Sequence, residues 1–149
     1  MKRALLLTVV GAAVAGIGVS AYLTVVHANL SALVCSSSGL VNCERVLSSG
    51  YGSVLGSALP TSATGILWFA VSGALAAARL RSESPLLART QLAWGALGLL
   101  AVLYLVYVEI DRVGAICVWC TAAHALVLLT LLAVLTLESA GAGRAPARR

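Results

Sequence analysis

The sequence predicts an all-α integral membrane protein: a bundle of four transmembrane helices, capped by an extracytoplasmic loop that carries a short helix. Three observations lead to this fold class. Of the 149 residues, 60% are hydrophobic and only 10% are charged, whereas a soluble domain has about 25% charged residues. The mean hydropathy is +1.00. Uncharged runs long enough to cross a bilayer occur four times, which leaves room for a single domain over residues 1–149.

The lengths of the four uncharged runs are close to the roughly 20 residues that a transmembrane helix needs. We expect spans at about 4–26, 60–78, 90–108 and 113–137, an outer loop at 27–59 and a cytoplasmic tail at 139–149. Glu44–Leu47 is the expected short helix in the outer loop. Glu109–Arg112 is expected to be a tight turn with solvated charges. The first run also permits a cleaved secretory signal, although it exceeds the usual apolar core of about 7–15 residues.

The basic residues predict the orientation. Eight of the ten fall on one side of the predicted membrane, and they are Lys2, Arg3, Arg79, Arg81, Arg89, Arg144, Arg148 and Arg149. Only Arg45 and Arg112 fall on the other side. By the positive-inside rule, both termini are cytoplasmic and the chain is a multi-pass protein of the inner or plasma membrane. The net charge of +5 forms no basic patch with interleaved aromatic residues, which excludes nucleic acid as an expected partner.

This orientation, derived from charge alone, places all four cysteines at or near the outer surface, where disulfides form and persist. Cys117 and Cys120 stand three residues apart, so on a helix they share a face, and a helix N-terminus favours a thiolate. If the helix begins near Val113, Cys117 lies about 6 Å below its start and Cys120 about 4.5 Å deeper. Cys117 can then meet Cys35 or Cys43 of the loop. Cys120 faces the hydrocarbon edge, where a lipid-soluble redox partner arrives.

Two other uses of the cysteines are weighed against a relay that works through mixed disulfides. A purely structural disulfide is a poor explanation of Cys-x-x-Cys, because closing so small a loop stabilises the fold only little through loop-closure entropy. A four-thiolate metal site needs short spacing in both pairs and would sit half inside a bilayer, so we expect no metal.

His124 follows Cys120 by four residues and shares its face. Ionisable residues within spans usually face the interior and serve function, although many simply pair with a neighbouring helix.

Several motifs taken together resemble the vitamin K epoxide reductase family. They are Cys35-x7-Cys43, Glu44-Arg45-Val46-Leu47-Ser48-Ser49, Leu59-Pro60-Thr61-Ser62, Gly65 and Cys117-Val118-Trp119-Cys120. The resemblance covers nearly the whole chain and is to a bacterial, stand-alone homologue. It implies a four-helix bundle around a quinone of the ubiquinone or menaquinone class, beneath the first outer loop.

The resemblance also implies roles for the four cysteines. Cys35 and Cys43 would exchange with a thioredoxin-fold dithiol partner outside the cytoplasm. Cys43 would then attack the helix disulfide at Cys117, and the released Cys120 would pass electrons to the quinone. The net result would be oxidation of the partner, which then places disulfides in secreted proteins.

The remaining site residues come from the same resemblance. Ser49 aligns with a family serine or threonine that assists near the quinone, although loop serines are commonly only solvated. Thr61 stands where the vertebrate enzyme has an Asn that donates to the quinone carbonyl, and His124 where it has a Tyr. A hydroxyl and an imidazole can each donate such a bond. Trp68 is expected to line the pocket. The contrasting function is a non-enzymatic membrane protein whose disulfides only stabilise its outer loop.

Overall fold

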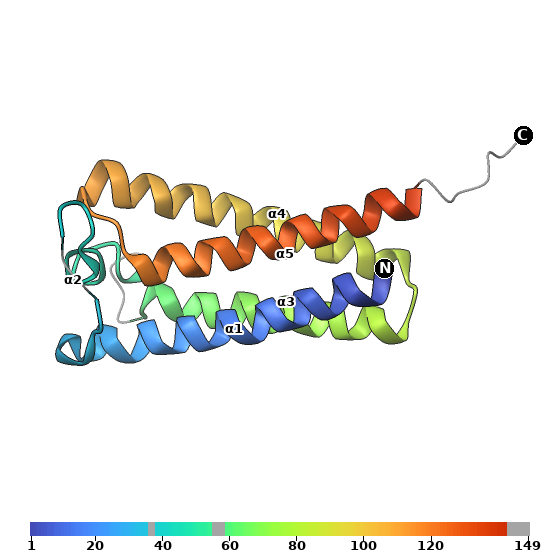
Figure 1. Ribbon diagram of the computed structural model, residues 1–149, viewed down its shortest axis with the longest axis horizontal. Helices are drawn as coiled ribbons and strands as arrows, with labels where there is room; N and C mark the ends of the chain where they lie inside the picture. The colour runs from blue at the N-terminus through green and yellow to red at the C-terminus, as the bar shows by residue number, and fades with distance from the viewer. Residues whose placement is uncertain (36–37, 55–58, 143–149) are drawn as a thin grey trace, which may run out of the picture.

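The computed structural model describes residues 1–35, 38–54 and 59–142 (Figure 1). Its helices are α1 (Lys2–Ala28), η1 (Leu30–Ala32), α2 (Cys43–Leu47), α3 (Thr61–Arg81), α4 (Pro85–Tyr107), η3 (Val108–Val113) and α5 (Val118–Ala142). Four helical stretches are long and apolar enough to cross a membrane. The described residues form isolated β-bridges but no strand. The predicted all-α transmembrane bundle, with a short helix in the connecting loop, is confirmed.

The long helices form a closed ring in which each one contacts two neighbours. α1 packs against α3 and α5, and α4 packs against the other faces of the same two helices. Figure 1 shows α2 at one end of the bundle, and the start of α1, the α3–α4 connection and the end of α5 at the opposite end. The cysteine-bearing segments are therefore grouped at the end that α2 occupies.

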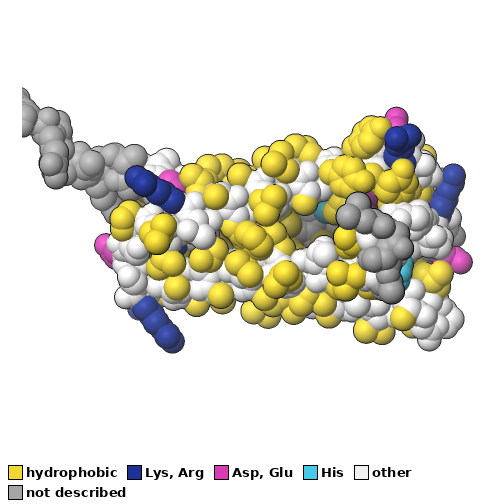
Figure 2. Space-filling model, turned by 180° about the vertical axis from the view of Figure 1, so that it is seen from behind, with side chains coloured by type: hydrophobic (Ala, Val, Ile, Leu, Met, Phe, Trp, Pro, Cys, Tyr) yellow, Lys and Arg dark blue, Asp and Glu magenta, His cyan; other side chains and the backbone are white. Residues whose placement is uncertain are grey.

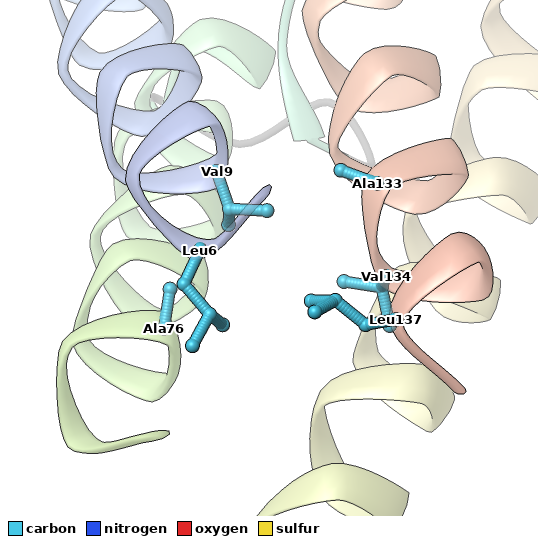
Figure 3. Close-up of a cluster of buried hydrophobic side chains, with 6 residues drawn as sticks. All are labelled: Leu6, Val9, Ala76, Ala133, Val134 and Leu137. Atoms are coloured by element: carbon cyan, nitrogen blue, oxygen red, sulfur yellow. The ribbon is translucent and has the colours of Figure 1, made fainter. Parts of the chain in front are cut away.

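The half of the bundle away from α2 is held together by close apolar packing. Leu6 and Val9 of α1, Ala76 of α3 and Val134 of α5 are fully buried in one cluster (Figure 3). Because lipid is as apolar as these side chains, close van der Waals packing rather than escape from water holds such helices together. On the face shown in Figure 2, hydrophobic side chains are spread along the middle and charged ones gather at the two ends, as expected of a membrane-spanning bundle.

A buried arginine ties three helices together at the end away from α2. Arg79 of α3 donates to Gln91 Oε1 of α4 at 2.8 Å and to Glu138 Oε1 of α5 at 2.6 Å. A buried guanidinium is tolerated only when it is paired and hydrogen-bonded. Nearby, Lys2 of α1 forms an ion pair with Glu83. These polar contacts fix this end of the bundle, so any rearrangement during function is expected at the other end.

The boundary before the fourth long helix differs most from prediction. α4 does not stop at a tight turn but continues into the π-helix η3, and Gly114, with a φ of 65°, ends it. The fourth helix consequently begins at Val118 rather than at Val113. The hydropathy of this run cannot reveal the break, because the residues on both sides of Gly114 are apolar. At its other end the helix extends to Ala142 and so includes residues 139–142 of the predicted tail, while 143–149 lie outside the described residues.

Two glycines allow the helices to approach closely around the site. A Cβ at Gly16 of α1 would lie 2.4 Å from the ring of Phe69 in α3, and a Cβ at Gly98 of α4 would lie 2.4 Å from the indole of Trp68. Small residues at helix contacts are the usual means of close packing in membranes.

We expect Gly16→Ala to destabilise the bundle by about 1–3 kcal/mol, the usual cost of overpacking a well-packed core. The measurement is the unfolding midpoint of the purified protein in detergent during a denaturing-detergent titration. Gly18→Ala is the matched control, because a Cβ at Gly18 meets nothing within 4 Å. Equal midpoints for the two variants would contradict the close α1–α3 contact.

Candidate active site

The loop that carries Cys43 is hydrogen-bonded to the segment that carries Cys117. The Asn42 amide donates to the Ile116 carbonyl at 3.0 Å, and the Ile116 amide donates to the Leu40 carbonyl at 2.8 Å. Asn42 and Ile116 immediately precede the two cysteines, so this pairing sets Cys43 beside Cys117. Both cysteine side chains are at most 1% exposed and belong to one buried cluster.

Cys43 is also the first residue of α2, and it forms a disulfide with Cys35 across a Cα–Cα distance of 6.3 Å. Asn42 caps the helix, since its Oδ1 accepts the Arg45 amide at 2.9 Å. A side-chain oxygen at this position satisfies one of the unpaired amides of the first turn. The same residue therefore fixes the start of α2 through its side chain and the contact with Ile116 through its backbone.

Two aromatic side chains hold the other flank of the loop pair, next to Cys35. The Val34 amide donates to the Tyr22 hydroxyl at 2.8 Å, and Trp119 Nε1 donates to the Val34 carbonyl at 2.9 Å. The rings of Tyr22 and Trp119 contact each other with centroids 4.8 Å apart. The aromatic residue inside the Cys-x-x-Cys motif thus contacts the loop.

Cys117 lies just before α5 rather than inside a helix, which corrects the expectation that it sits a turn below a helix start at Val113. Its carbonyl accepts the Thr121 amide at 2.9 Å, the first hydrogen bond of α5. The Cys120 amide lies 3.3 Å from the Cys117 sulfur as a donor. Hydrogen bonds from the Cys120 side chain and then from the Cys120 and Trp119 amides lower the pKa of the Cys117 thiol, against the opposing effect of burial. Both Cys117 and Cys120 are free thiols.

A cavity of about 360 Å³ lies inside the bundle beneath the loop. Five of the residues expected at the site line it, and they are Ser49, Thr61, Trp68, Cys120 and His124. Cys120 therefore faces the cavity, while its partner Cys117 is buried against the loop. The two thiols of the motif connect two compartments, the loop disulfide on one side and the cavity on the other.

The polar side chains at the cavity differ in whether they have a hydrogen-bond donor left for a ligand. Ser49 Oγ donates to the Val46 carbonyl at 2.7 Å, and Thr61 Oγ1 donates to the Tyr51 carbonyl at 2.9 Å. A hydroxyl has one proton to donate, so in this arrangement both present lone pairs. His124 is buried, and its side chain forms no hydrogen bond with the described residues. Its ring has a donor to offer a ligand.

Sequence reasoning missed Trp94. Trp68 Nε1 donates to the Trp94 carbonyl at 3.3 Å, and Trp94 Nε1 donates to the Trp68 carbonyl at 3.1 Å. This reciprocal pair joins α3 to α4, and both residues line the cavity. Trp68 comes seven residues after Thr61, about 10 Å farther along α3. Trp94 carries no mark in the sequence that separates it from the interfacial tryptophans common in membrane proteins.

Sequence reasoning also placed Glu109 wrongly, as a solvated charge. Glu109 is only 5% exposed and lines the cavity. Its carboxyl group lies close enough to the thiols of Cys117 and Cys120 to interact with them electrostatically. Val102, Leu105 and Glu109 all line the cavity at the spacing of one helix face. That periodicity could have located Glu109 if the helix had been taken to continue past Val108.

No group of three or more His, Cys, Asp or Glu side chains that could hold a metal ion occurs among the described residues. The geometry instead combines a buried thiol pair, a neighbouring disulfide and an apolar cavity with a few polar groups. Such a set suits electron transfer through sulfur to a small apolar acceptor.

Comparison with known families now adds to the geometry. The sequence profile described as the vitamin K epoxide reductase family matches residues 7–136. The chain belongs to this family. Comparison with curated proteins gives no significant match. Membership in the vitamin K epoxide reductase family makes the chain a membrane oxidoreductase of disulfide and quinone chemistry.

We expect Tyr22→Phe to loosen the Val34 end of the loop by removing one hydrogen-bond acceptor. A net hydrogen bond is worth about 0.5–1.5 kcal/mol, so amide hydrogen exchange of the segment around Val34 should speed up about two- to tenfold. The measurement is hydrogen exchange followed by mass spectrometry of the peptide covering residues 29–35. Tyr104→Phe is the control, since Tyr104 is 56% exposed on the outer surface; equal exchange in both variants would contradict the Tyr22 contact.

Proposed function

We propose that this protein oxidises a thioredoxin-fold dithiol partner and passes the electrons to a quinone. Cys35 and Cys43 receive the electrons, and Cys117 and Cys120 deliver them. The observation that carries the proposal is the hydrogen-bonded pairing of Asn42 with Ile116, because it sets the loop sulfur beside the helix sulfur while Cys120 faces the cavity.

The proposed exchange balances at each step. The partner's two thiols reduce the Cys35–Cys43 bond and leave as a disulfide. The Cys43 thiolate then attacks Cys117 of an oxidised Cys117–Cys120 pair, and Cys120 leaves with the electron pair. Cys35 next attacks Cys43, which restores the loop disulfide and releases Cys117. The hydrogen bonds on the Cys117 sulfur favour this release, since a thiol of lower pKa leaves faster.

The resulting state, with an oxidised loop pair and a reduced helix pair, matches the sulfur bonding of the structure. From it, Cys117 and Cys120 form a disulfide and give up two electrons and two protons. A quinone in the cavity takes both and becomes a quinol. In this exchange Cys43 changes its disulfide partner between Cys35 and Cys117. Only small side-chain movements are needed, because hydrogen bonds hold the loop backbone on both flanks.

The cavity supports a quinone of the ubiquinone or menaquinone class as the acceptor. Its volume of about 360 Å³ lies at the lower end of the roughly 300–1,000 Å³ of small-molecule sites. Trp68 and Trp94 give it flat apolar walls for a ring. In the proposed pose His124 donates to a quinone carbonyl, and Ser49 and Thr61 lie near the ring. The differences from the vertebrate pattern at Thr61 and His124 argue against vitamin K epoxide as the substrate.

The proposed orientation follows from the basic residues. Both termini face the cytoplasm, and the end of the bundle with α2 and the cysteines faces outward, where a periplasmic or extracytoplasmic partner meets Cys35. Oxidation of that partner on this side would support disulfide formation in secreted proteins.

Quinone reduction by the purified protein tests this function. With a reduced thioredoxin-fold dithiol as donor, we expect quinol to form, and Cys43→Ala or Cys120→Ala to lower its rate to background. Quinol is followed by its ultraviolet absorbance. A protein whose disulfides are only structural would give no quinol with the unmodified chain, and an undiminished rate in either variant would contradict the relay.

Trapping the mixed disulfide tests the sulfur path separately. A Cys35→Ser/Cys120→Ser double variant leaves only Cys43 and Cys117, which we expect to join as the main oxidised species under a mild oxidant. Peptide mass spectrometry identifies the bond. The matched control, Cys43→Ser/Cys117→Ser, leaves Cys35 and Cys120, which lie on the outer flank of the loop and in the cavity. Faster coupling in the control would contradict the proposed order.

A further inference from the structure

Glu109 is a buried carboxyl group near the end of Pro85–Val113, a helical stretch long and apolar enough to cross a membrane. The π-helix η3 brings Glu109 inward, while Asp111 and Arg112 of the same helix have side chains 57% and 55% exposed. Charged groups at such depth are costly and are usually paired or functional. Among the described residues, no Lys or Arg forms an ion pair with Glu109. Instead, its carboxyl group lines the cavity together with Cys120, and the two groups interact electrostatically.

Few other titratable groups face this carboxyl group. Of the described residues that line the cavity, Cys120 and His124 come from α5 and Tyr51 from the outer loop. α1 and α3 contribute only uncharged side chains to the lining, such as Ser20 and Thr61. Among the described residues, none that lines the cavity is a Lys or Arg that would neutralise Glu109. The thiols of Cys120 and Cys117, which both interact with it electrostatically, carry exchangeable protons.

We propose that Glu109 is the catalytic acid–base of quinone reduction, taking the proton of the Cys120 thiol and giving it to a quinone oxygen. This rests on the proposed function, because it assigns a residue to the last step of that relay. The geometry that carries it is the placement of the buried carboxyl group and of the reacting sulfur in the wall of one cavity.

The step balances as follows. The Cys120 S–H bond breaks and its proton moves to the Glu109 carboxylate. The Cys117–Cys120 bond forms as the Cys117 S–H bond breaks, and two electrons reduce the quinone. Glu109 returns its proton to one quinone oxygen, and the proton from Cys117 reaches the other. The carboxylate is thereby regenerated, and no further reactant is needed.

Replacing Glu109 by Gln keeps the size of the side chain but removes the group that takes up and releases a proton. General acid–base catalysis typically contributes about 10²–10⁴-fold, so we expect Glu109→Gln to lower kcat for quinone reduction at neutral pH by at least about 10²-fold. The deficit should shrink as pH rises, because hydroxide replaces the missing base. Glu109→Asp should recover part of the rate. Asp111→Asn, a change of the exposed carboxylate on the same helix, should leave the rate and its pH profile unchanged.

A second readout separates catalysis from simple damage. Removing a neighbouring negative charge favours the Cys120 thiolate, so a small membrane-permeant alkylating reagent should modify Cys120 in Glu109→Gln about threefold faster or more. A variant that reacts faster with the reagent but reduces quinone more slowly has lost proton transfer. The Cys43–Cys117 trapping of the double variant should persist when Glu109→Gln is added, which shows that the fold is retained. If the trapping is lost, Glu109→Asp decides: recovery of both the trapping and part of the rate supports the need for a carboxyl group, and recovery of the trapping without the rate would contradict it.

The outcomes distinguish this inference from the function it rests on. Absence of quinol with the unmodified protein would overturn the proposed function, and the alkylation rates would still report whether Glu109 acts on Cys120. Normal quinol formation with an unchanged rate and pH profile in Glu109→Gln would overturn the role of Glu109 alone. Unchanged alkylation of Cys120 in that variant would do the same.

Discussion

The pairing of Asn42 with Ile116 is the contact on which the rest of the site depends. Two backbone hydrogen bonds join a loop between α1 and α3 to Ile116, two residues before the start of α5, and they place the cysteines that follow close together. Backbone hydrogen bonds are well suited to this task, because they fix position without depending on side-chain rotamers. The loop serves both as the lid of the cavity and as the carrier of the first sulfur pair.

The two thiols of the Cys-x-x-Cys motif face different surroundings. In the proposed function, the partner is exposed to water and the acceptor is soluble in lipid, so electrons must cross the wall between them. Cys117 is buried under the loop and Cys120 faces the cavity, which makes the motif that crossing. Disulfide exchange passes electrons along the sulfur atoms but does not carry protons to the acceptor. In a cavity of low dielectric constant an isolated charge is costly, which is why a buried carboxyl group beside Cys120 gains importance.

Much of the fold follows from one-dimensional features of the sequence. Apolar runs of membrane length predict the four long helices and even the short helix at Glu44–Leu47, because in lipid a helix is the way to satisfy a single segment's backbone. The start of the last span at Val113 was wrong for a specific reason. Gly114 adopts a left-handed conformation that ends η3, and hydropathy does not distinguish such a break from a continuous apolar helix.

The sequence by itself determined the candidate site residues: four cysteines at recognisable spacing, with Ser49, Thr61, Trp68 and His124 in motifs typical of the family. It could do so because spacing along a chain is a local property. Only the tertiary structure decided that Glu109 faces inward and that Trp94 closes the cavity with Trp68. Both depend on how neighbouring helices meet and on one π-turn, and no local pattern encodes the direction in which a side chain points once its helix is packed.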